Sequence, residues 1–330
     1  MRSLIVVCLS PAIDRNYKVA SFLPGGLNRC ENPVISPGGK GVNVARVLAI
    51  LGAKVRCIGF FAGENGQYII KNLQHNKVIV DAILLKGETR SSINILDSST
   101  GKETEILEAG PTVNPQEMEQ FINRFRQIIS QEVGKIAGSS PPIVIFSGGV
   151  PRGLPISIYE DLINISKEYK AECFLDSSSE ALSYGINAKP GLIKPNTREL
   201  SSIIKKIIEI NGNIDKEFLI NIYNETRKIE IPYVAVTFGK AGSMLCVDGK
   251  VFFAHPIPIV AVNTIGSGDS FTAGLAFAMA NQYSWKRMLE LAVACASSNA
   301  LFEQVGFIDL QQVKEFQNMV EIDEFVVEMR

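Results

Sequence analysis

Short runs of consecutive hydrophobic residues alternate along most of the chain with longer segments in which hydrophobic residues recur every three or four positions. The short runs predict strands buried on both faces, and the longer segments predict amphipathic helices. The expected strands are 3–9, 54–60, 78–84, 143–147, 173–176, 192–194, 234–237 and 259–262. The expected helices are 41–51, 66–74, 116–132, 156–168, 198–209, 216–228, 269–280, 285–301 and 310–320. This order predicts an α/β fold with a mostly parallel sheet covered on both faces.

Three pairs of alternating segments depart from that order and predict hairpins: 15–20 with 29–35, 91–96 with 103–107, and 243–247 with 250–254. The first two pairs would form a small antiparallel β lid beside the core, built from about 12–36 and 88–109. Open strand edges invite pairing with another chain, so a homodimer through the lid is one arrangement that the sequence allows. No linker rich in Pro or Ser divides the chain, and residues 1–330 are expected to form one domain.

The near-zero net charge limits the classes of partner that the sequence predicts. The 330 residues carry 33 basic and 34 acidic side chains, for a net charge of −1, which gives no electrostatic reason to expect nucleic acid or an anionic membrane. No hydrophobic run reaches the roughly 18 residues of a membrane span, and no signal peptide is recognised. Six scattered cysteines favour buried free thiols in a reducing cytoplasm, the expected compartment. The two histidines, His75 and His255, are far apart, which disfavours a histidine zinc site and a Ser-His-Asp triad.

Residues 263–270 read Asn-Thr-Ile-Gly-Ser-Gly-Asp-Ser and lead into the expected helix 269–280. The free N–H groups of a helix start, together with the helix dipole, bind anions such as a phosphoryl group. Gly266 and Gly268 let the backbone approach such an anion. Asp269 would accept a proton from an attacking hydroxyl, and the helix start is expected to favour its ionised form. The alternative is an ordinary helix N-terminus with an acidic residue in its first turn.

Polar and glycine residues follow nearly every expected strand. In an open parallel sheet, ligands bind beyond the carboxyl ends of the strands, so these residues should lie together. The segments concerned are 10–14, 147–151, 176–178, 194–199, 237–242 and 263–269. The sequence therefore predicts one ligand-binding edge assembled from both halves of the chain.

Residues 37–43, Pro-Gly-Gly-Lys-Gly-Val-Asn, open a second helix. Gly38 and Gly39 would let backbone N–H groups reach a ligand, Asn43 offers a donor and an acceptor to a diol, and Lys40 offers a charge. The alternative is a plain helix start with a solvated lysine. The chain has neither a Walker A loop nor a Gly-x-Gly-x-x-Gly segment, so a dinucleotide-dependent oxidoreductase is not indicated.

Two further sets of side chains are candidates for a metal and for a phosphate. Asn196 and Glu199 place an amide and a carboxylate on the first turn of a helix, where oxygen ligands suit Mg²⁺, although a plain capping pair has the same spacing. Arg29, Lys40 and Arg90 lie in or beside the expected lid and the first glycine loop. Each alone is usually a solvated charge, and together they would clamp a phosphate already present on the substrate.

These segments resemble the ribokinase-like sugar kinases (the PfkB family), and within them the phosphosugar branch that contains 1-phosphofructokinase and tagatose-6-phosphate kinase. Residues 37–46 resemble the N-terminal signature of the family, residues 263–274 its C-terminal signature, and residues 194–200 its magnesium-linked motif. The resemblance covers essentially the whole chain. It implies a three-layer α/β/α core with a small β lid, and a phosphotransferase that uses ATP and Mg²⁺.

The resemblance also implies a role for each matching residue. Asp269 would be the catalytic base, and the anion hole would consist of Gly266, Ser267 and Gly268. Mg²⁺ would be placed with the help of Asn196 and Glu199. The residues implied in ATP binding are Lys194, Asn196, Thr237, Gly239, Gly242, Asn263, Ile265 and Asn299. Those implied in binding the sugar and its phosphate are Asp14, Gly38, Gly39, Asn43, Ser147, Lys40, Arg90 and Arg29.

The resemblance favours fructose 1-phosphate as the substrate, with fructose 1,6-bisphosphate as the product, because residues 176–182 look more like that branch. The alternative is tagatose-6-phosphate kinase, followed by 6-phosphofructokinase and a neutral-sugar kinase. Departures from the family pattern are small: Ser267 stands where Ala is usual, Thr237 where Ser is usual, and Gly149 follows Ser147-Gly148 in place of a Ser. A sensor without catalytic activity should have lost Asp269 or the glycine turn, and both are present.

Overall fold

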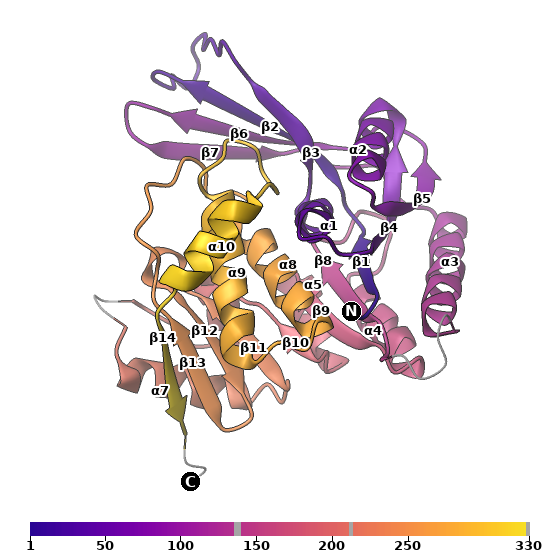
Figure 1. Cartoon of the computed structure of the whole chain (residues 1–330). Coiled ribbons are helices and arrows are strands. Elements are labelled where there is room, and N and C mark those ends of the chain that lie inside the picture. Colours follow the sequence, from indigo (N-terminus) through magenta and orange to yellow (C-terminus); the bar gives the residue numbers. More distant parts are fainter. Residues whose placement is uncertain (135–139, 211–213, 328–330) are drawn as a thin grey trace.

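The computed structural model describes residues 1–134, 140–210 and 214–327, and its main body is a ten-stranded sheet covered by helices (Figure 1). The strand order is β14-β13-β12-β11-β10-β9-β8-β1-β4-β5. Seven neighbouring strands are parallel: β5 (Ile79–Leu85), β4 (Val55–Ala62), β1 (Leu4–Cys8), β8 (Ile143–Ser147), β9 (Glu172–Asp176), β10 (Leu192–Ile193) and β11 (Tyr233–Thr237). Three antiparallel strands complete the sheet: β12 (Ser243–Val247), β13 (Lys250–Ala254) and β14 (Ile322–Val326).

Strand β1 illustrates why the parallel strands are hydrophobic throughout. All five of its residues are buried, because helices cover both faces of the sheet. Alternate residues point to opposite faces, so Leu4 and Val6 join one hydrophobic core while Ile5 and Val7 join the other.

The helices fall into two layers. One core includes side chains of α1 (Lys40–Ile50), α2 (Gly63–His75), α8 (Ser267–Ala280), α9 (Trp285–Asn299) and α10 (Leu310–Met319). The other core includes side chains of α3 (Pro115–Gly134), α4 (Ile158–Glu168), α5 (Ser179–Asn187), α6 (Thr197–Ile204) and α7 (Lys216–Arg227). The three-layer α/β/α architecture expected from the sequence is confirmed.

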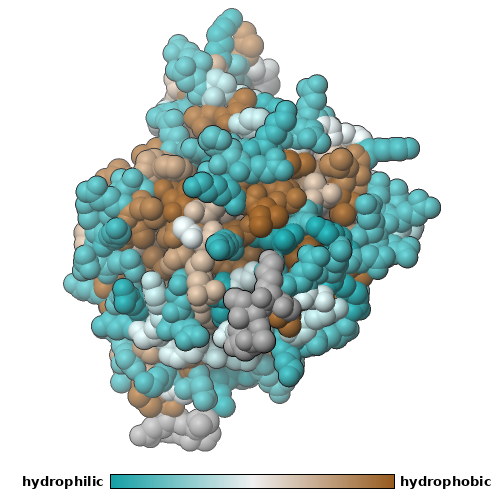
Figure 2. Space-filling view, turned by 45° about the vertical axis from the view of Figure 1, so that its right-hand side comes forward, coloured by the Kyte–Doolittle hydropathy of each residue, from teal (hydrophilic) through white to brown (hydrophobic). Residues whose placement is uncertain are grey.

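A second sheet projects from the top of the main body in Figure 1. It contains β3 (Val34–Gly38), β2 (Ala12–Val19), β6 (Ser91–Asp97) and β7 (Lys102–Leu107), in that order. Figure 2 shows the same projection, with hydrophilic side chains over most of it and hydrophobic surface across the middle of the face below. The sheet is not purely antiparallel as expected, because its two central strands, β2 and β6, run parallel. Both strands leave the core from the carboxyl ends of parallel strands, β1 and β5, and therefore enter the second sheet in the same direction.

Several predicted boundaries are corrected. Residues 259–262 are not a strand, and Val260 is 90% exposed. The helix expected over 198–209 ends at Ile204, because Lys205 adopts a left-handed conformation (φ 53°) and the Ser201 hydroxyl accepts the N–H of Ile208. The first lid hairpin consists of residues 12–19 and 34–38 rather than 15–20 and 29–35. Helix α5 and edge strand β14 were not predicted, because both are short and neither has a strong hydrophobic period.

Candidate active site

The two glycine-rich segments of the sequence meet at the start of helices α1 and α8. Asp269 lies in the first turn of α8 and is only 6% exposed. The Asn43 side-chain amide, from α1, donates a hydrogen bond of 2.9 Å to Asp269 Oδ2. These residues are 226 positions apart in the sequence, so the contact exists only because α1 and α8 pack side by side on one face of the sheet.

The glycine turn before Asp269 presents free backbone donors. Gly266 has φ 78°, and a Cβ there would lie 2.6 Å from the side chain of Val305, so this position requires glycine. Among the described residues, the N–H groups of Gly268 and Asp269 have no hydrogen-bond partner. The N–H of Ser267 donates to the Thr264 carbonyl at 3.2 Å, so its predicted role in the anion hole would require this bond to open.

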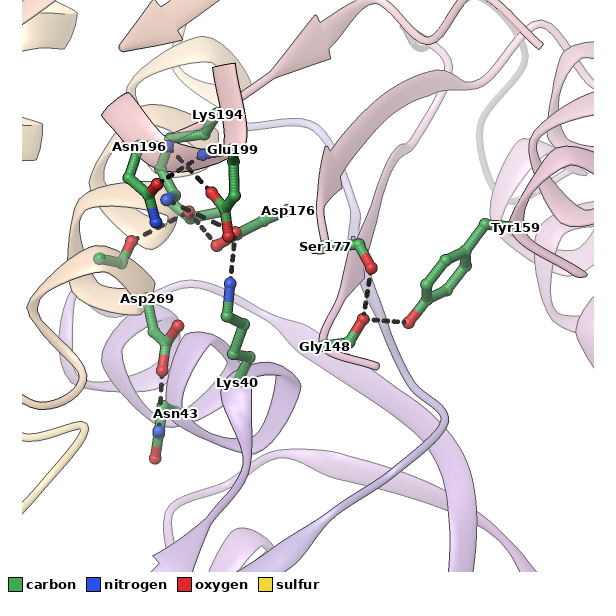
Figure 3. A network of polar contacts seen from close by, with 12 residues as sticks. Lys40, Asn43, Gly148, Tyr159, Asp176, Ser177, Lys194, Asn196, Glu199 and Asp269 are labelled. Carbon is green, nitrogen blue, oxygen red and sulfur yellow. Dashed lines mark hydrogen bonds and ion pairs between the residues drawn. The ribbon is translucent and has the colours of Figure 1, made fainter. Parts of the chain in front are cut away.

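A cluster of charges beside the turn is centred on Asp176, the last residue of β9. Its carboxylate is 1% exposed. Lys40 Nζ lies 3.0 Å from Asp176 Oδ1, and Lys194 Nζ lies 3.4 Å from the same oxygen. The Thr272 hydroxyl, one turn after Asp269 in α8, donates to Asp176 Oδ2 at 2.8 Å. Figure 3 shows that Lys40, Lys194 and Asp269 surround this carboxylate from different elements.

The two carboxylates differ in proton affinity. Burial is the main reason why the pKa of Asp269 is raised, to about 6, and the Asp176 charge adds to this effect against Lys40, the Asn43 hydrogen bond and Lys194. Burial also acts to raise the pKa of Asp176, but Lys194, Lys40 and Thr272 together hold it below its usual value. The expectation that the helix start keeps the pKa of Asp269 low is therefore corrected: loss of water outweighs the helix dipole.

A third buried carboxylate lies near Asp269: Asp14 of β2, whose pKa is raised to about 7 by burial and then by Asp269. Gly38 is needed beside it, since a Cβ there would lie 2.0 Å from Asp14 Oδ2. Gly39 precedes α1 with φ 84°. Arg90 Nε donates to the Ser10 hydroxyl at 3.1 Å, and among the described residues Arg90 has no ion pair with a carboxylate.

The segments after β10 and β11 lie side by side. Asn196 forms a β-bridge with Thr237, and the Thr237 N–H donates to the Pro195 carbonyl at 3.2 Å. Asn196 and Glu199 form a capping box in which each side chain accepts the other's backbone N–H at 2.9 Å. The turn that follows Thr237 contains Gly239 and Gly242, both with positive φ, and ends where β12 begins.

The sequence matches the model of the pfkB family of carbohydrate kinases over residues 2–307. The chain belongs to this family. It is therefore a phosphotransferase that acts on a sugar hydroxyl, and ATP binding is expected for the family.

Relatives and solved structures agree with this membership. Tagatose-6-phosphate kinase of Staphylococcus epidermidis is 31% identical over 328 residues, which cover 97% of this chain and 99% of the relative. The crystal structure of phosphofructokinase-2 from Escherichia coli in complex with fructose-6-phosphate is 25% identical, with a TM-score of 0.81 over 97% of this chain and 99% of that chain. The same enzyme in complex with substrates and products is 24% identical, with a TM-score of 0.85 over the same shares.

Asn196 and Glu199 are the side chains of this pfkB kinase that could bind Mg²⁺. The capping box occupies one oxygen of Glu199, Oε2, and leaves Oε1 available as a ligand. Among residues 1–134, 140–210 and 214–327, no group of three or more His, Cys, Asp or Glu side chains could hold a metal by itself. Mg²⁺ usually binds through one or two protein oxygens together with water and substrate phosphates.

Some expected site residues of this kinase lie apart from Asp269 or behind the surface. Ser147 is fully buried, and its hydroxyl has no partner within the part of the chain that the structure describes. Asn299 is fully buried, and its amide is bonded to Ile265, Ser267 and Gly306. It therefore supports the glycine turn from behind rather than facing a ligand.

The three residues of the expected basic clamp have different surroundings. Arg29 lines a hollow of about 530 Å³ under the small sheet, together with Asn263 and Glu303. Lys40 is paired with Asp176, and Arg90 lies near Asp14. Arg90 is therefore the member of the three that lies close to a buried carboxylate and forms no ion pair within residues 1–134, 140–210 and 214–327.

The sequence interpretation missed the central role of Asp176. The sequence placed Asp176 only among the polar residues after a strand and in the segment 176–182 used to compare substrates, and Thr272 only within the C-terminal signature 263–274; neither was given a role of its own. The available signal was an acidic residue at the carboxyl end of a hydrophobic strand. Its lysine partners come from positions 136 residues before it and 18 residues after it, which no local pattern connects.

All six cysteines are free thiols; five are buried, and Cys30 is partly buried. Within the described ranges, no helix is long and apolar enough to cross a membrane.

Proposed function

We propose that this pfkB kinase transfers the terminal phosphoryl group of ATP to a primary hydroxyl of a ketohexose monophosphate and so forms a ketohexose bisphosphate. The observation that carries the proposal is the hydrogen bond between Asn43 and Asp269. It joins a glycine loop suited to sugar hydroxyls to a helix start suited to a phosphoryl group.

Asp269 is the proposed general base. Its raised pKa of about 6 leaves it mostly ionised above neutral pH and makes it a stronger base than an ordinary aspartate. It remains far too weak to remove the proton of a sugar alcohol in advance. The proton therefore moves to Asp269 as the new O–P bond forms and the bond to the ADP oxygen breaks.

Stabilisation of charge on the moving phosphoryl group is assigned to backbone and lysine donors. Phosphoryl transfer depends mainly on positioning and on electrostatic stabilisation. The free N–H groups of Gly268 and Asp269 point out of the helix start. Lys194 Nζ lies 3.6 Å from the position of a Cβ on Gly268, which puts its charge next to these donors. Mg²⁺, held through Asn196 and Glu199, would neutralise charge on the nucleotide phosphates when bound.

Two ketohexose phosphates are the candidate acceptors. The sequence resemblance at residues 176–182 favours fructose 1-phosphate, and the 31% identical tagatose-6-phosphate kinase favours tagatose 6-phosphate equally. Both present a free primary hydroxyl, at opposite ends of the sugar. Arg90, which has no ionic partner among the described residues, is the proposed ligand of the phosphate already present.

A substrate panel tests the assignment. ADP release would be measured with fructose 1-phosphate, tagatose 6-phosphate, fructose 6-phosphate, fructose and ribose, with ³¹P NMR of the products to locate the new phosphate. We expect kcat/KM to be highest for fructose 1-phosphate or tagatose 6-phosphate. A preference for ribose or free fructose would contradict the proposal.

We also propose that two copies associate through the small sheet. Strand β7 is an edge strand whose six residues are all exposed, including Ile106 and Leu107. Exposed strand edges with apolar side chains favour pairing with another chain. Sedimentation analysis of the wild type and of Ile106→Lys should give a dimer and a weakened dimer, and a monomeric wild type would contradict this arrangement.

A further inference from the structure

Asp176 connects more elements of the site than any other described side chain near it. It is the last residue of β9, and its carboxylate contacts Lys40 of α1, Lys194 just after β10, and Thr272 of α8. A carboxylate that is 1% exposed is stable as an anion only with such compensation. These three contacts connect the segment of the first glycine loop (Lys40), the magnesium-linked motif (Lys194) and the helix that follows the glycine turn (Thr272).

The lysines are held next to Asp269 without being bonded to it. Lys40 and Lys194 both contact Asp176 Oδ1, and among the described residues neither forms an ion pair with Asp269. The hydrogen bond of Asp269 comes from the neutral Asn43 instead. Asp176 thus binds the two lysines whose positive charges would otherwise lie nearest to Asp269.

We propose that Asp176 is a positioning residue: it holds Lys40 and Lys194 beside the glycine turn, so that they face an incoming phosphoryl group and do not neutralise Asp269. The inference rests on the proposed role of Asp269 as the base. A base paired with two lysines would bind a proton weakly, and lysines paired with the base would be turned away from the nucleotide.

The charged groups that face Asp269 all come from named elements. They are Lys40 on α1, Asp176 on β9, Lys194 after β10 and Asp14 on β2, with Arg90 beside Asp14. Burial and the Asp269 charge raise the pKa of Asp14 to about 7, so the titrations of the two aspartates must be resolved separately.

The test compares Asp176→Asn with Asp81→Asn. Asp81 on β5 is also a buried carboxylate between two cations, Arg56 and Arg124, but its partners do not reach Asp269. The titration of Asp269 would be followed by ¹³C NMR of carboxyl-labelled, ligand-free protein, with Asp269→Asn and Asp14→Asn spectra for assignment. This readout does not depend on the substrate, so it separates failure of this inference from failure of the substrate assignment.

We expect Asp176→Asn to lower the midpoint of the Asp269 titration by about 1 pH unit, because the variant removes a negative charge that raises this pKa and releases two lysines that then act on Asp269. Asp81→Asn should leave the midpoint unchanged. With the substrate identified by the panel, kcat of Asp176→Asn should fall by roughly 10–100-fold, the range for a displaced catalytic group. A midpoint unchanged from the wild type would overturn the inference.

A second variant keeps the test decisive if Asp176→Asn does not fold. Lys40 is 35% exposed, so Lys40→Gln should fold. It removes a charge that lowers the pKa of Asp269, and the midpoint should therefore move to higher pH. No upward movement in this variant would show that the lysine charge does not act on Asp269, and the inference would fail.

Discussion

Two buried carboxylates of the main sheet, Asp176 and Asp81, are each held by two basic side chains, yet they have different surroundings. Asp176 is the last residue of β9, at the carboxyl end of a parallel strand. Asp81 is the third residue of β5, close to the amino end, and its partner Arg56 also contacts Glu132. Ligands of parallel sheets bind at the carboxyl ends, so only the first cluster lies beside the candidate active site.

The two carboxylates also differ in the type of basic side chain that binds them. Asp81 is bound by two arginines, whose planar guanidinium groups hold a carboxylate in a fixed geometry. Asp176 is bound by two lysines, whose ammonium groups are compact charges on flexible stems and can turn toward a phosphate. We therefore expect the Asp81 cluster to serve the fold, while the Asp176 cluster has the proposed role of holding charge for a ligand.

The largest expected effect is on the base itself. Asp269→Asn should lower kcat by roughly 10²–10⁴, the range for a lost general base, with little change in the affinity for ATP. Steady-state kinetics with the substrate identified by the panel measures this effect. Near-normal turnover would remove Asp269 from the mechanism.

Thermal unfolding of the same variant provides the control. The folded-state pKa of Asp269, about 6, lies above that of an unfolded aspartate, so its ionised form destabilises the folded protein above about pH 6, and this penalty fades as the pH falls toward 4. Asp269→Asn should therefore have an equal or higher Tm at pH 8. A lower Tm would attribute the loss of activity to misfolding.

Asp81→Asn should show the opposite pattern. Asp81→Asn leaves Arg124 without an ionic partner among the described residues and leaves Arg56 with Glu132 alone, so we expect a loss of about 2–4 kcal/mol in the free energy of unfolding. The value of kcat should stay within about twofold of the wild-type value, because the effect of the Asp81 charge on Asp269 weakens steeply with the distance between them. Urea unfolding and kinetics on one preparation would measure both, and a large loss of kcat would break the distinction between the clusters.

Arg90 is a basic side chain that has no carboxylate partner among the described residues. Arg90→Ala should raise KM for the sugar phosphate by roughly 10–100-fold and KM for ATP much less, since a charged hydrogen bond contributes about 1.5–3 kcal/mol. Arg124→Ala, which removes a partner of Asp81, serves as the matched control and should leave both KM values unchanged. Equal changes in both KM values for Arg90→Ala would argue against a phosphate contact.

The pH dependence of wild-type kcat sharpens the comparison further. Asp269 must be ionised to accept a proton, so kcat should be level at alkaline pH and fall below about pH 6, by about tenfold for each unit well below that value. Asp81→Asn should give the same profile. A rate independent of pH between 5 and 8 would exclude Asp269 as the base.

The smallest effect is expected for an exposed ion pair. Lys250 and Glu324 connect β13 to the edge strand β14 at 2.8 Å, and both side chains are more than 40% exposed. Lys250→Gln should change the free energy of unfolding by less than about 0.5 kcal/mol, because water screens such pairs. A change comparable to that of Asp81→Asn would mean that burial does not explain the difference between these pairs.

Much of the fold was predictable from local patterns. The hairpin of β12 and β13 has the residue bounds that the alternating pattern predicted. The buried strands and most helices were also located, because the hydrophobic period is a property of the segment itself. The parallel pairing of β2 with β6 was missed, since no local signal states which distant strand lies alongside.

Some features of the candidate site were likewise predictable from local sequence, and others were not. Both glycine loops, Asp269 and Asn43 were identified from the sequence, because a loop that must approach an anion requires a run of glycines and a polar residue beside it. Arg29 was grouped with Lys40 and Arg90 because all three are basic and lie in or beside the lid and the glycine loop. In the structure Arg29 lines the hollow under the small sheet, to which Lys40 and Arg90 do not contribute.

The sequence by itself determined which segments can become strands, helices and glycine turns, and which reactive side chains the chain carries at their ends. Only the tertiary structure decided how those ends meet: that Asn43 bonds to Asp269, that Asp176 rather than Asp269 takes the two lysines, and that burial raises the pKa of Asp269. The physical reason is that hydrophobic period and turn chemistry act over a few residues. Charge pairing and the loss of water depend on distances in space between residues that are far apart in the chain.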